Sequence, residues 1–245
     1  MSETIQRGAL YVVSTPIGNL DDISHRAVRI LSGVDLIAAE DTRTSRILLS
    51  HIGVDKPLIS FFSHNERRRL PALVEMLRAG QSIALITDAG TPGVSDPAFS
   101  IVREAVTNGL PVIPVPGPSA LLAALVSSGL PMDRFVFEGF LPLKKGRKKR
   151  LEFLRTEKRT IVLYESPHRL RKTLEELLGY LGDRRVAVAR EMTKKFEEVV
   201  RGNLSDVTSR FRTKEPRGEF VIVVAGQDPM EDSHGQEEPD HPTSC

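Results

Sequence analysis

The stretch SIALITDAGTPGVSDP (residues 82–97) decides the fold. After Ser82, the residues up to Thr87 are apolar or β-branched and are typical of a buried strand. The glycines and prolines that follow indicate a tight turn, and a helical pattern comes next. A strand, a turn and a helix in this order form the repeating unit of an α/β protein with a parallel sheet.

The same alternation extends in both directions along the chain. Further strand-like runs are expected at 9–14, 36–39, 58–62, 112–115, 160–165, 185–190, 197–201 and 220–225. Helical patterns separate most of these runs. The sequence therefore predicts an α/β fold of two lobes with mostly parallel sheets.

One segment interrupts the alternation and suggests where the lobes divide. Residues 140–150 combine Pro142 and Gly146 with six basic residues. We place the boundary just before this segment. The predicted organisation is a flexible N-terminus at 1–8, a first lobe at 9–139, a second lobe at 140–226 and a disordered acidic tail at 227–245.

Composition limits the classes of function. The chain has 245 residues, of which 40% are apolar and 27% charged, as in an ordinary globular protein. The one cysteine, Cys245, excludes a disulfide framework or a cysteine zinc site within one chain. Aromatic residues make up only 5%, which argues against a general base-stacking surface. We expect no signal peptide and no transmembrane span, and hence a cytoplasmic protein.

The net charge of +2 hides an asymmetry. Six of the 32 acidic residues lie in 227–245, which has no Lys or Arg, so the rest of the chain has eight more basic than acidic residues. A basic body suits a polyanionic partner such as RNA.

Three turns that follow predicted strands carry the strongest sign of a ligand site. They are residues 14–20 (STPIGNL), 87–96 (TDAGTPGVSD) and 116–119 (PGPS). In open α/β sheets, ligands bind at the carboxyl ends of strands, and glycine lets the backbone approach them closely. None of these turns is a phosphate-binding loop of the known patterns, no histidine spacing indicates a metal, and no serine-hydrolase elbow is present.

Several long motifs together carry a family resemblance. In chain order they are STPIGNLDDIS (14–24), AAEDTRTS (38–45), HNE (64–66), LITDAGTPGVSDPA (85–98), PVPGPSA (114–120), FVFEGFL (135–141), LYESPHRL (163–170), AREMTK (189–194) and RGEFVIVVAG (217–226). The chain resembles, over about residues 8–226, the ribosomal RNA small subunit methyltransferase I family of the tetrapyrrole methylase-like superfamily.

The resemblance implies a reaction, a cofactor and partners. The enzyme would transfer a methyl group from S-adenosylmethionine to the ribose 2′-oxygen of a cytidine in the decoding region of 16S ribosomal RNA. It would act as a homodimer on that RNA or on the small ribosomal subunit, with the cofactor in a cleft between the lobes. The cofactor-binding residues carried over by resemblance are Pro16, Ile17, Asp88, Ala89, Gly90, Val94, Ser95, Ser119, Ala120, Leu163 and Tyr164.

Methyl transfer from a sulfonium needs no metal, and the enzyme mainly has to align the reacting atoms. The ribose hydroxyl is a poor nucleophile, for which we consider the bases Glu165, His64, Glu40 and Glu191. Glu165 ranks first because it ends a predicted strand of the second lobe. Its alternative role is to cap the following helix or to pair with an arginine.

The basic run is the expected RNA-binding segment. We assign RNA contacts to Lys144, Lys145, Arg147 and Lys148, with a solvated surface as the alternative.

Two other functions stay open. One is a methyltransferase of the same fold that acts on a small molecule such as a tetrapyrrole. The first turn counts against it, because TPIGNL (15–20) lacks the glycine-rich pattern common in tetrapyrrole methylases. The other is a non-catalytic RNA-binding assembly factor, which would leave the three ligand-type turns unexplained.

Overall fold

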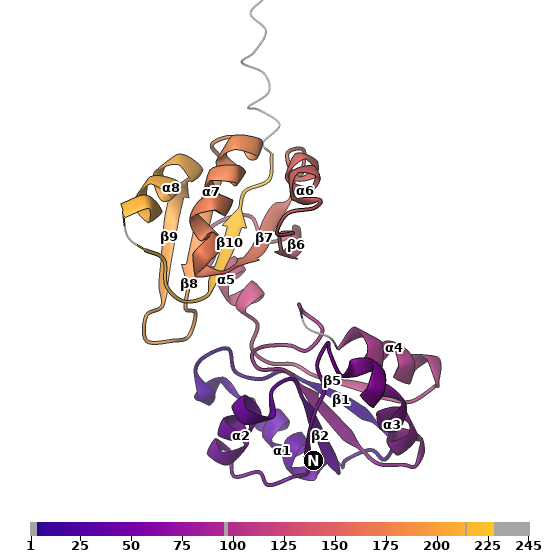
Figure 1. Cartoon of the computed structure of the whole chain (residues 1–245). Coiled ribbons are helices and arrows are strands. Elements are labelled where there is room, and N and C mark those ends of the chain that lie inside the picture. Colours follow the sequence, from indigo (N-terminus) through magenta and orange to yellow (C-terminus); the bar gives the residue numbers. More distant parts are fainter. Residues whose placement is uncertain (1–3, 96–97, 214, 228–245) are drawn as a thin grey trace, which may run out of the picture. The chain divides into compact units, whose positions relative to one another are not determined.

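The computed structural model describes residues 4–95, 98–213 and 215–227 (Figure 1). The chain divides into two compact units. Unit 1 consists of residues 1–123 together with 191–197, and unit 2 consists of 124–190 and 198–245. Each unit is organised around its own β-sheet.

The sheet of unit 1 has five parallel strands in the order β3-β2-β4-β1-β5. The strands are β1 (Leu10–Val13), β2 (Leu36–Ala39), β3 (Leu58–Ser60), β4 (Ile83–Ile86) and β5 (Val112–Val115). All four residues of β2 and of β4 are buried, because helices cover both faces of a parallel sheet. This confirms the parallel α/β architecture predicted for the first lobe.

Helices of unit 1 lie on both faces of its sheet (Figure 1). The helices are α1 (His25–Gly33), α2 (Thr42–His51), α3 (Glu66–Arg78) and α4 (Phe99–Thr107), with a short 3-10 helix, η1, at Leu20–Asp22. The next helix, α5 (Ala120–Ser128), contains the division between the two units. One core cluster joins α1 and α2 to the sheet, and a second joins α3 and α4 to it. The sheet is thus enclosed from both sides, and its carboxyl edge is occupied by turns.

The sheet of unit 2 has the order β6-β7-β10-β8-β9. Its elements are β6 (Phe135–Phe140), α6 (Arg147–Leu154), β7 (Thr160–Glu165), α7 (Pro167–Leu181), β8 (Arg185–Arg190), β9 (Glu198–Asn203), α8 (Leu204–Thr213) and β10 (Phe220–Val224). Among the described strands of this sheet, only β6 and β7 pair in parallel, and the other pairs are antiparallel. The expectation of mostly parallel sheets was therefore wrong for the second lobe.

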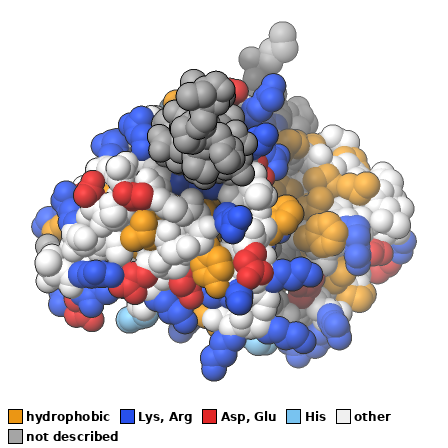
Figure 2. Space-filling view, turned by 90° about the horizontal axis from the view of Figure 1, so that it is seen from above, with side chains coloured by type: hydrophobic (Ala, Val, Ile, Leu, Met, Phe, Trp, Pro, Cys, Tyr) orange, Lys and Arg blue, Asp and Glu red, His pale blue; other side chains and the backbone are white. Residues whose placement is uncertain are grey.

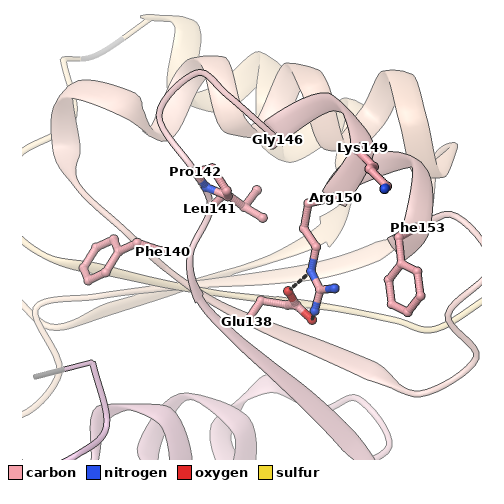
Figure 3. A pocket seen from close by; sticks show the side chains of 8 residues that line it. All are labelled: Glu138, Phe140, Leu141, Pro142, Gly146, Lys149, Arg150 and Phe153. Atoms are coloured by element: carbon pink, nitrogen blue, oxygen red, sulfur yellow. Dashed lines mark hydrogen bonds and ion pairs between the residues drawn. The ribbon is translucent and has the colours of Figure 1, made fainter.

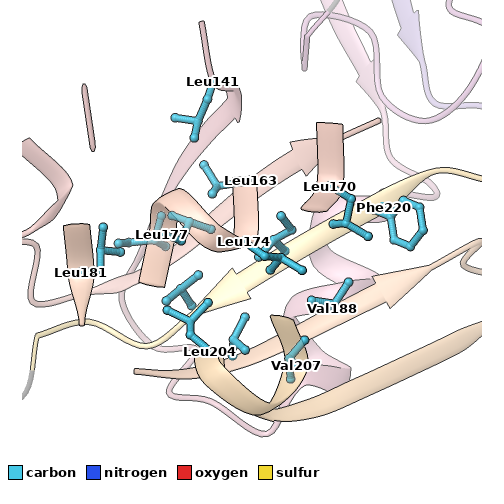
Figure 4. Packing of buried hydrophobic residues seen from close by; sticks show 14 of the residues in the cluster. Leu141, Leu163, Leu170, Leu174, Leu177, Leu181, Val188, Leu204, Val207 and Phe220 are labelled. Carbon is cyan, nitrogen blue, oxygen red and sulfur yellow. The ribbon is translucent and has the colours of Figure 1, made fainter. Parts of the chain in front are cut away.

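Leucines spaced along α7 build the core of unit 2 (Figure 4). Leu170, Leu174, Leu177 and Leu181 recur at the helical period and face strands β7, β8 and β10. Burial of each such side chain stabilises the fold by about 1.5–3 kcal/mol. The helices α6 and α8 add Leu151, Leu154, Leu204 and Val207 to the same cluster.

The division between the units lies earlier than predicted. It falls inside α5, after Ala123, and not at 139/140. The reason is that β6, which the sequence analysis assigned to the first lobe, pairs with β7 over five residue pairs and so belongs to the second sheet. The segment 191–197, between β8 and β9, returns to unit 1.

The two chain ends differ in what the structure describes. The N-terminal segment predicted to be flexible makes two specific contacts within residues 4–8: Ile5 lies against the core cluster of α1 and α2, and the Gln6 amide donates to the Tyr11 hydroxyl at 2.8 Å. Residues 228–245, which form nearly all of the predicted disordered tail, lie outside the described residues. Gln227 is described, and its amide donates to the Glu157 carbonyl at 2.6 Å.

Candidate functional site

The turns after β1 and β4 are joined by their backbones. Thr15 and Gly90 form a two-residue bridge, in which the Thr15 amide donates to the Gly90 carbonyl at 2.9 Å and the Gly90 amide donates back at 3.1 Å. The Thr15 hydroxyl also donates to the Thr87 carbonyl at 3.1 Å. Since β1 and β4 are neighbours in the sheet, these bonds extend their pairing beyond the strand ends.

The turn after β5 is joined to the same assembly by hydroxyl groups. The Ser14 and Thr91 hydroxyls lie 2.8 Å apart, and the Thr91 hydroxyl donates to the Pro118 carbonyl at 3.3 Å. Gly117 has little room for a side chain, because a Cβ there would lie 3.0 Å from the Ser14 Cβ. The structure therefore brings the three predicted ligand-type turns together at one edge of one sheet.

Backbone conformation in the second turn is also unusual. Gly90 has φ of 85°, a left-handed value that favours glycine, and Ser95 adopts φ of 84° although it has a side chain. A non-glycine residue in this region costs free energy of order 1–3 kcal/mol, and such residues cluster at functional sites. The geometry of this turn is consistent with a ligand-binding role.

Asp88 presents a carboxylate at this edge. The residue is exposed, and its Oδ1 accepts a hydrogen bond from the backbone amide of Asp41 at 3.1 Å. Partial burial raises the pKa of Asp88, and the nearby charges of Glu40 and Asp41 raise it further. A carboxylate whose ionised form is disfavoured in this way would gain from a cationic or hydrogen-bond-donating ligand.

The neighbours of Asp88 have partners of their own. Glu40 accepts a hydrogen bond from the Thr87 hydroxyl at 2.6 Å. Asp41 pairs with Arg43 at 2.7 Å, and hydrogen bonds from Arg43 lower the pKa of Asp41 to about 2. Glu40, one of the candidate bases, is thus engaged in holding the turn after β4.

The predicted cofactor residues of unit 1 lie in the three joined turns, except Ala120, which is the first residue of α5. They differ in exposure: Pro16, Ile17 and Gly90 are buried, Val94, Ser119 and Ala120 are half-buried, and Asp88, Ala89 and Ser95 are exposed. The roles of three hydroxyl groups were not predicted from the sequence. The hydroxyls of Ser14, Thr15 and Thr91 form hydrogen bonds that connect the turns. Their signal is available in the sequence, as Ser14 and Thr15 directly follow the apolar run of β1.

The two predicted cofactor residues of unit 2 have different surroundings. The side chain of Leu163 is fully buried in the core, so only its backbone is left for a ligand. Tyr164 is half-buried, with its ring edge-on to Phe137 and Phe140 at centroid distances of 4.9 Å and 5.7 Å. A cofactor cleft made by both units stays a prediction.

Glu165, the first-ranked base, is part of a buried polar network. It is 2% exposed, and its carboxylate accepts hydrogen bonds from the Thr173 hydroxyl at 2.6 Å and the Ser166 amide at 2.8 Å. Arg169 lies 3.3 Å away through its Nε. These contacts favour the alternative role considered from the sequence, in which Glu165 holds the start of α7 and pairs with an arginine.

The other candidate bases are placed differently. His64 is exposed after β3, with its ring edge-on to Phe62 at 5.9 Å. Glu191 has a left-handed φ of 48° and pairs with Lys194 at 3.0 Å. The stem of Lys194 covers Gly18 in the first turn, where an added Cβ would lie 2.3 Å from the Lys194 Cγ. The returning segment 191–197 therefore packs onto the first turn, a contact that the sequence did not predict.

Arg147 is a correction to the predicted RNA-binding residues. It is 6% exposed, and its guanidinium donates to Glu176 at 2.7 Å, to the Thr173 hydroxyl at 2.7 Å and to the Pro142 carbonyl at 3.2 Å. A guanidinium with these buried partners serves the fold and is not free to bind phosphate. A charge run read from sequence alone does not reveal which of its members turns inward.

The lysines of the run are exposed, as expected of RNA-binding residues. Lys144 and Lys145 lie before α6, and Lys148 on α6 is 3.8 Å from Glu152 in a surface pair. Figure 2 shows Lys and Arg side chains spread over the viewed face, with Asp and Glu side chains between them.

The described part of the chain offers neither a metal site nor a membrane span. Within residues 4–95, 98–213 and 215–227, no group of His, Cys, Asp or Glu side chains is arranged to hold a metal ion. No helix of the same residues is both long enough and apolar enough to cross a bilayer.

Comparison with known proteins identifies the relatives of this chain. The family model of the Tetrapyrrole (Corrin/Porphyrin) Methylases matches residues 9–208. Two proteins named ribosomal RNA small subunit methyltransferase I are similar over nearly the whole chain. The one from Synechocystis sp. is 51% identical and covers 91% of this chain and 80% of its own. The one from Thermotoga maritima is 46% identical, and the match covers 90% of this chain and 100% of that protein.

Solved structures confirm the fold. Uroporphyrin-III C-methyltransferase from Thermus thermophilus, complexed with S-adenyl homocysteine, superposes with a TM-score of 0.63. The match covers 89% of this chain and 97% of that one at 19% identity. Together with the sequence relatives, this shows that the chain belongs to the ribosomal RNA small subunit methyltransferase I family of the tetrapyrrole methylases.

Proposed function

We propose that this protein transfers a methyl group from S-adenosylmethionine to the ribose 2′-oxygen of a cytidine in the decoding region of 16S ribosomal RNA. The observation that carries the proposal is the joining of three turns around Asp88 at the carboxyl edge of the parallel sheet. The names of relatives at 46–51% identity support ribosomal RNA as the substrate class.

The residues of the joined turns fit the proposed cofactor. Asp88 offers a carboxylate, and the turn carbonyls offer further acceptors, which suit both ribose hydroxyls and a sulfonium. Ile17 and Val94 offer apolar surface beside them. The left-handed Gly90 has Ile17 within 3.4 Å of the place of a Cβ, so a side chain there would crowd this surface. When bound, S-adenosylmethionine supplies an electrophilic methyl group.

The residues of the chain mainly position the reactants. Asp88 and the turn backbones would hold the donor, and the hydrogen bonds that join the turns to one another keep these groups in place. Glu165 is not retained as a base, because its oxygens already accept hydrogen bonds from Thr173 and Ser166. His64 remains the proposed base, because its imidazole is exposed after β3, whose carboxyl end lies at the same edge as the turns.

The proposed partners follow from the same family membership. Lys144, Lys145 and Lys148 supply exposed positive charge for the phosphates of the RNA or of the small ribosomal subunit. We further propose that the protein acts as a homodimer in the cytoplasm. A tetrapyrrole substrate is less well supported, because the tetrapyrrole methyltransferase described above is only 19% identical.

The test is transfer of tritiated methyl groups from S-adenosylmethionine to small subunits that lack the modification. We expect label on the ribose of one cytidine in the decoding region. The variant Asp88→Asn should show little transfer. Label on a base, or no label with either small subunits or naked 16S RNA, would contradict the proposal.

A further inference from the structure

We propose that the pocket between β6 and α6 binds one unstacked nucleotide of an RNA strand. The pocket lies entirely in unit 2 and encloses about 480 Å³, a size typical of pockets for small organic ligands. Its main lining side chains are Glu138, Phe140, Pro142, Lys149, Arg150 and Phe153 (Figure 3). The inference rests on the proposed RNA substrate and adds a specific contact to it.

Two phenylalanine rings give the pocket apolar, flat surfaces. Phe140 is 52% exposed and Phe153 is 60% exposed, and Figure 3 shows them on opposite sides of the Glu138–Arg150 pair. Large apolar side chains that gather at one exposed hollow mark an interaction site more often than scattered ones do. Nucleobases stack on aromatic rings of this kind in single-stranded RNA complexes.

The guanidinium of Arg150 forms a third flat surface. Glu138, whose side chain is 7% exposed, binds it through both carboxylate oxygens, and the guanidinium lies 4.8 Å from the centroid of the Phe153 ring. These hydrogen bonds fix the plane of the guanidinium, and they also raise the pKa of Arg150. Because Glu138 balances its charge, Arg150 contributes a stacking plane more than an anion-binding group.

Lys149 supplies the positive charge that the Glu138–Arg150 pair does not. It is exposed at the pocket, and no ion pair joins it to any other residue that the structure describes. A free phosphate would use Lys149 but would leave the two rings bare. An apolar peptide side chain would use the rings but not the lysine. A nucleotide combines a flat base with an anionic phosphate and matches both features.

The wall of the pocket is held by two partly buried hydrogen bonds. Arg147 donates to the Pro142 carbonyl at 3.2 Å, and Arg169 donates to the Leu141 carbonyl at 2.6 Å. Gly146 directly precedes α6 and has a left-handed φ of 85°, which turns the chain from this wall into the helix. The pocket is therefore held in shape before a ligand arrives, which reduces the ordering cost of binding.

The experiment compares Phe153→Leu with Phe99→Leu in the full chain. Phe99 is a matched control, because it is 69% exposed on α4 of unit 1 and also has an arginine, Arg103, near its ring. The probe is a short fluorescein-labelled single-stranded RNA. We expect Phe153→Leu, and likewise Phe140→Leu, to weaken binding about fivefold or more, with an unchanged slope of log K against log[salt]. Lys149→Ala should instead reduce that slope by about 0.7.

Each outcome separates this inference from the proposed function. Calorimetric affinity for S-adenosylmethionine should stay at the wild-type value in all four variants. If the wild type methylates small subunits but Phe153→Leu binds RNA as Phe99→Leu does, the nucleotide pocket is refuted and the methyltransferase stands. If Phe153→Leu weakens binding of small subunits but not of naked RNA, the occupant is a protein and the inference is also overturned. If the wild type transfers no methyl group, the proposed function fails whatever the pocket binds.

Discussion

Two carboxylates stand at strand ends of the two sheets, and their surroundings are opposite. Asp88 follows β4, is exposed, and accepts a hydrogen bond from the backbone amide of Asp41. Glu165 ends β7, is buried, and is bound by a hydroxyl, an amide and an arginine. Both positions look alike in the sequence, since each acidic residue comes at the end of an apolar run.

The difference shows what makes such a carboxylate available for chemistry. Glu165 has its hydrogen-bonding capacity taken up by the protein, and its environment stabilises the fold. Partial burial and the nearby charges of Glu40 and Asp41 raise the pKa of Asp88 in spite of the hydrogen bond from the Asp41 amide, so its ionised form would gain from a cationic or hydrogen-bond-donating ligand. We therefore expect substitutions of the two residues to affect different properties.

The largest effect is expected from Glu165→Ala. This change leaves Thr173, Ser166 and Arg169 without their buried acceptor, and breaking such a pair costs about 3–5 kcal/mol. Urea-induced unfolding measures the loss. The conservative Glu165→Gln keeps an acceptor for Thr173 and should lose less. If Glu165→Ala keeps wild-type stability and loses only methyl transfer, Glu165 is a base after all and the contrast with Asp88 disappears.

Asp88→Asn should have the converse effect. Stability should change by less than about 0.5 kcal/mol, because the residue is exposed and fills no core. Affinity for S-adenosylmethionine should fall about tenfold or more, since hydrogen bonds to a charged group contribute about 1.5–3 kcal/mol. Calorimetry measures it, with Asp55→Asn as the control, because Asp55 is exposed before β3 and so lies at the opposite edge of the sheet. Unchanged affinity would remove Asp88 from the site.

As pH falls, cofactor affinity should begin to decline at a higher pH than it would with an aspartate of ordinary pKa. Burial raises the pKa of Asp88, so its carboxylate becomes protonated at a pH above the usual value of about 3.9. Affinity should therefore be full at neutral pH and decline as pH falls through this raised pKa. The stability of the fold has the opposite pH dependence. Because the pKa of Asp88 is raised in the folded state, ionisation of this residue lowers the free energy of unfolding as pH rises. A calorimetric pH series in wild type and Asp88→Asn checks this, and the variant should lack the decline.

The smallest effect on the fold is expected from the lysines beside Arg147. Simultaneous replacement by Ala of Lys144, Lys145 and Lys148 should change the free energy of unfolding by roughly 0.5 kcal/mol or less per site. It should reduce the salt slope of RNA binding by about 0.7 for each phosphate that is no longer neutralised. Lys172→Ala is the control, because Lys172 on α7 forms a similar surface pair, 3.9 Å from Glu176. If the triple variant has the wild-type salt slope of RNA binding, these lysines form a solvated surface and do not contact phosphates.

Local patterns in the sequence predicted most of unit 1. The period of apolar residues and the turn residues predicted the strands and the order of strand and helix, because the central strands β1, β2 and β4 of unit 1 are short, mostly buried apolar runs. The second sheet was harder. The apolar residues of β8 and β9 indicate strands, but the antiparallel pairing of these strands depends on partners elsewhere in the chain and not on local pattern. The same limit explains why β6 was assigned to the wrong lobe.

The position of the candidate site could be predicted from the sequence better than the roles of individual residues could. The three turns could be predicted because glycine and proline after a strand indicate the local backbone geometry. The structure shows that hydrogen bonds join these turns. The roles of Glu165 and Arg147 depended on which way each side chain points. Partners far along the chain decide that direction: Thr173 lies eight residues from Glu165, and Glu176 is 29 residues from Arg147.

The return of residues 191–197 to unit 1 has a consequence for the order of events during translation. A ribosome releases β1 to β5 first, but the last piece of unit 1, with the Lys194 stem that covers Gly18, emerges only after β6, β7 and β8. N-terminal units generally fold as they emerge, and contacts between distant residues form slowly. The turn after β1 therefore reaches its final packing only when much of unit 2 has been synthesised, so a nascent chain stalled before residue 191 should hold an unfinished first turn.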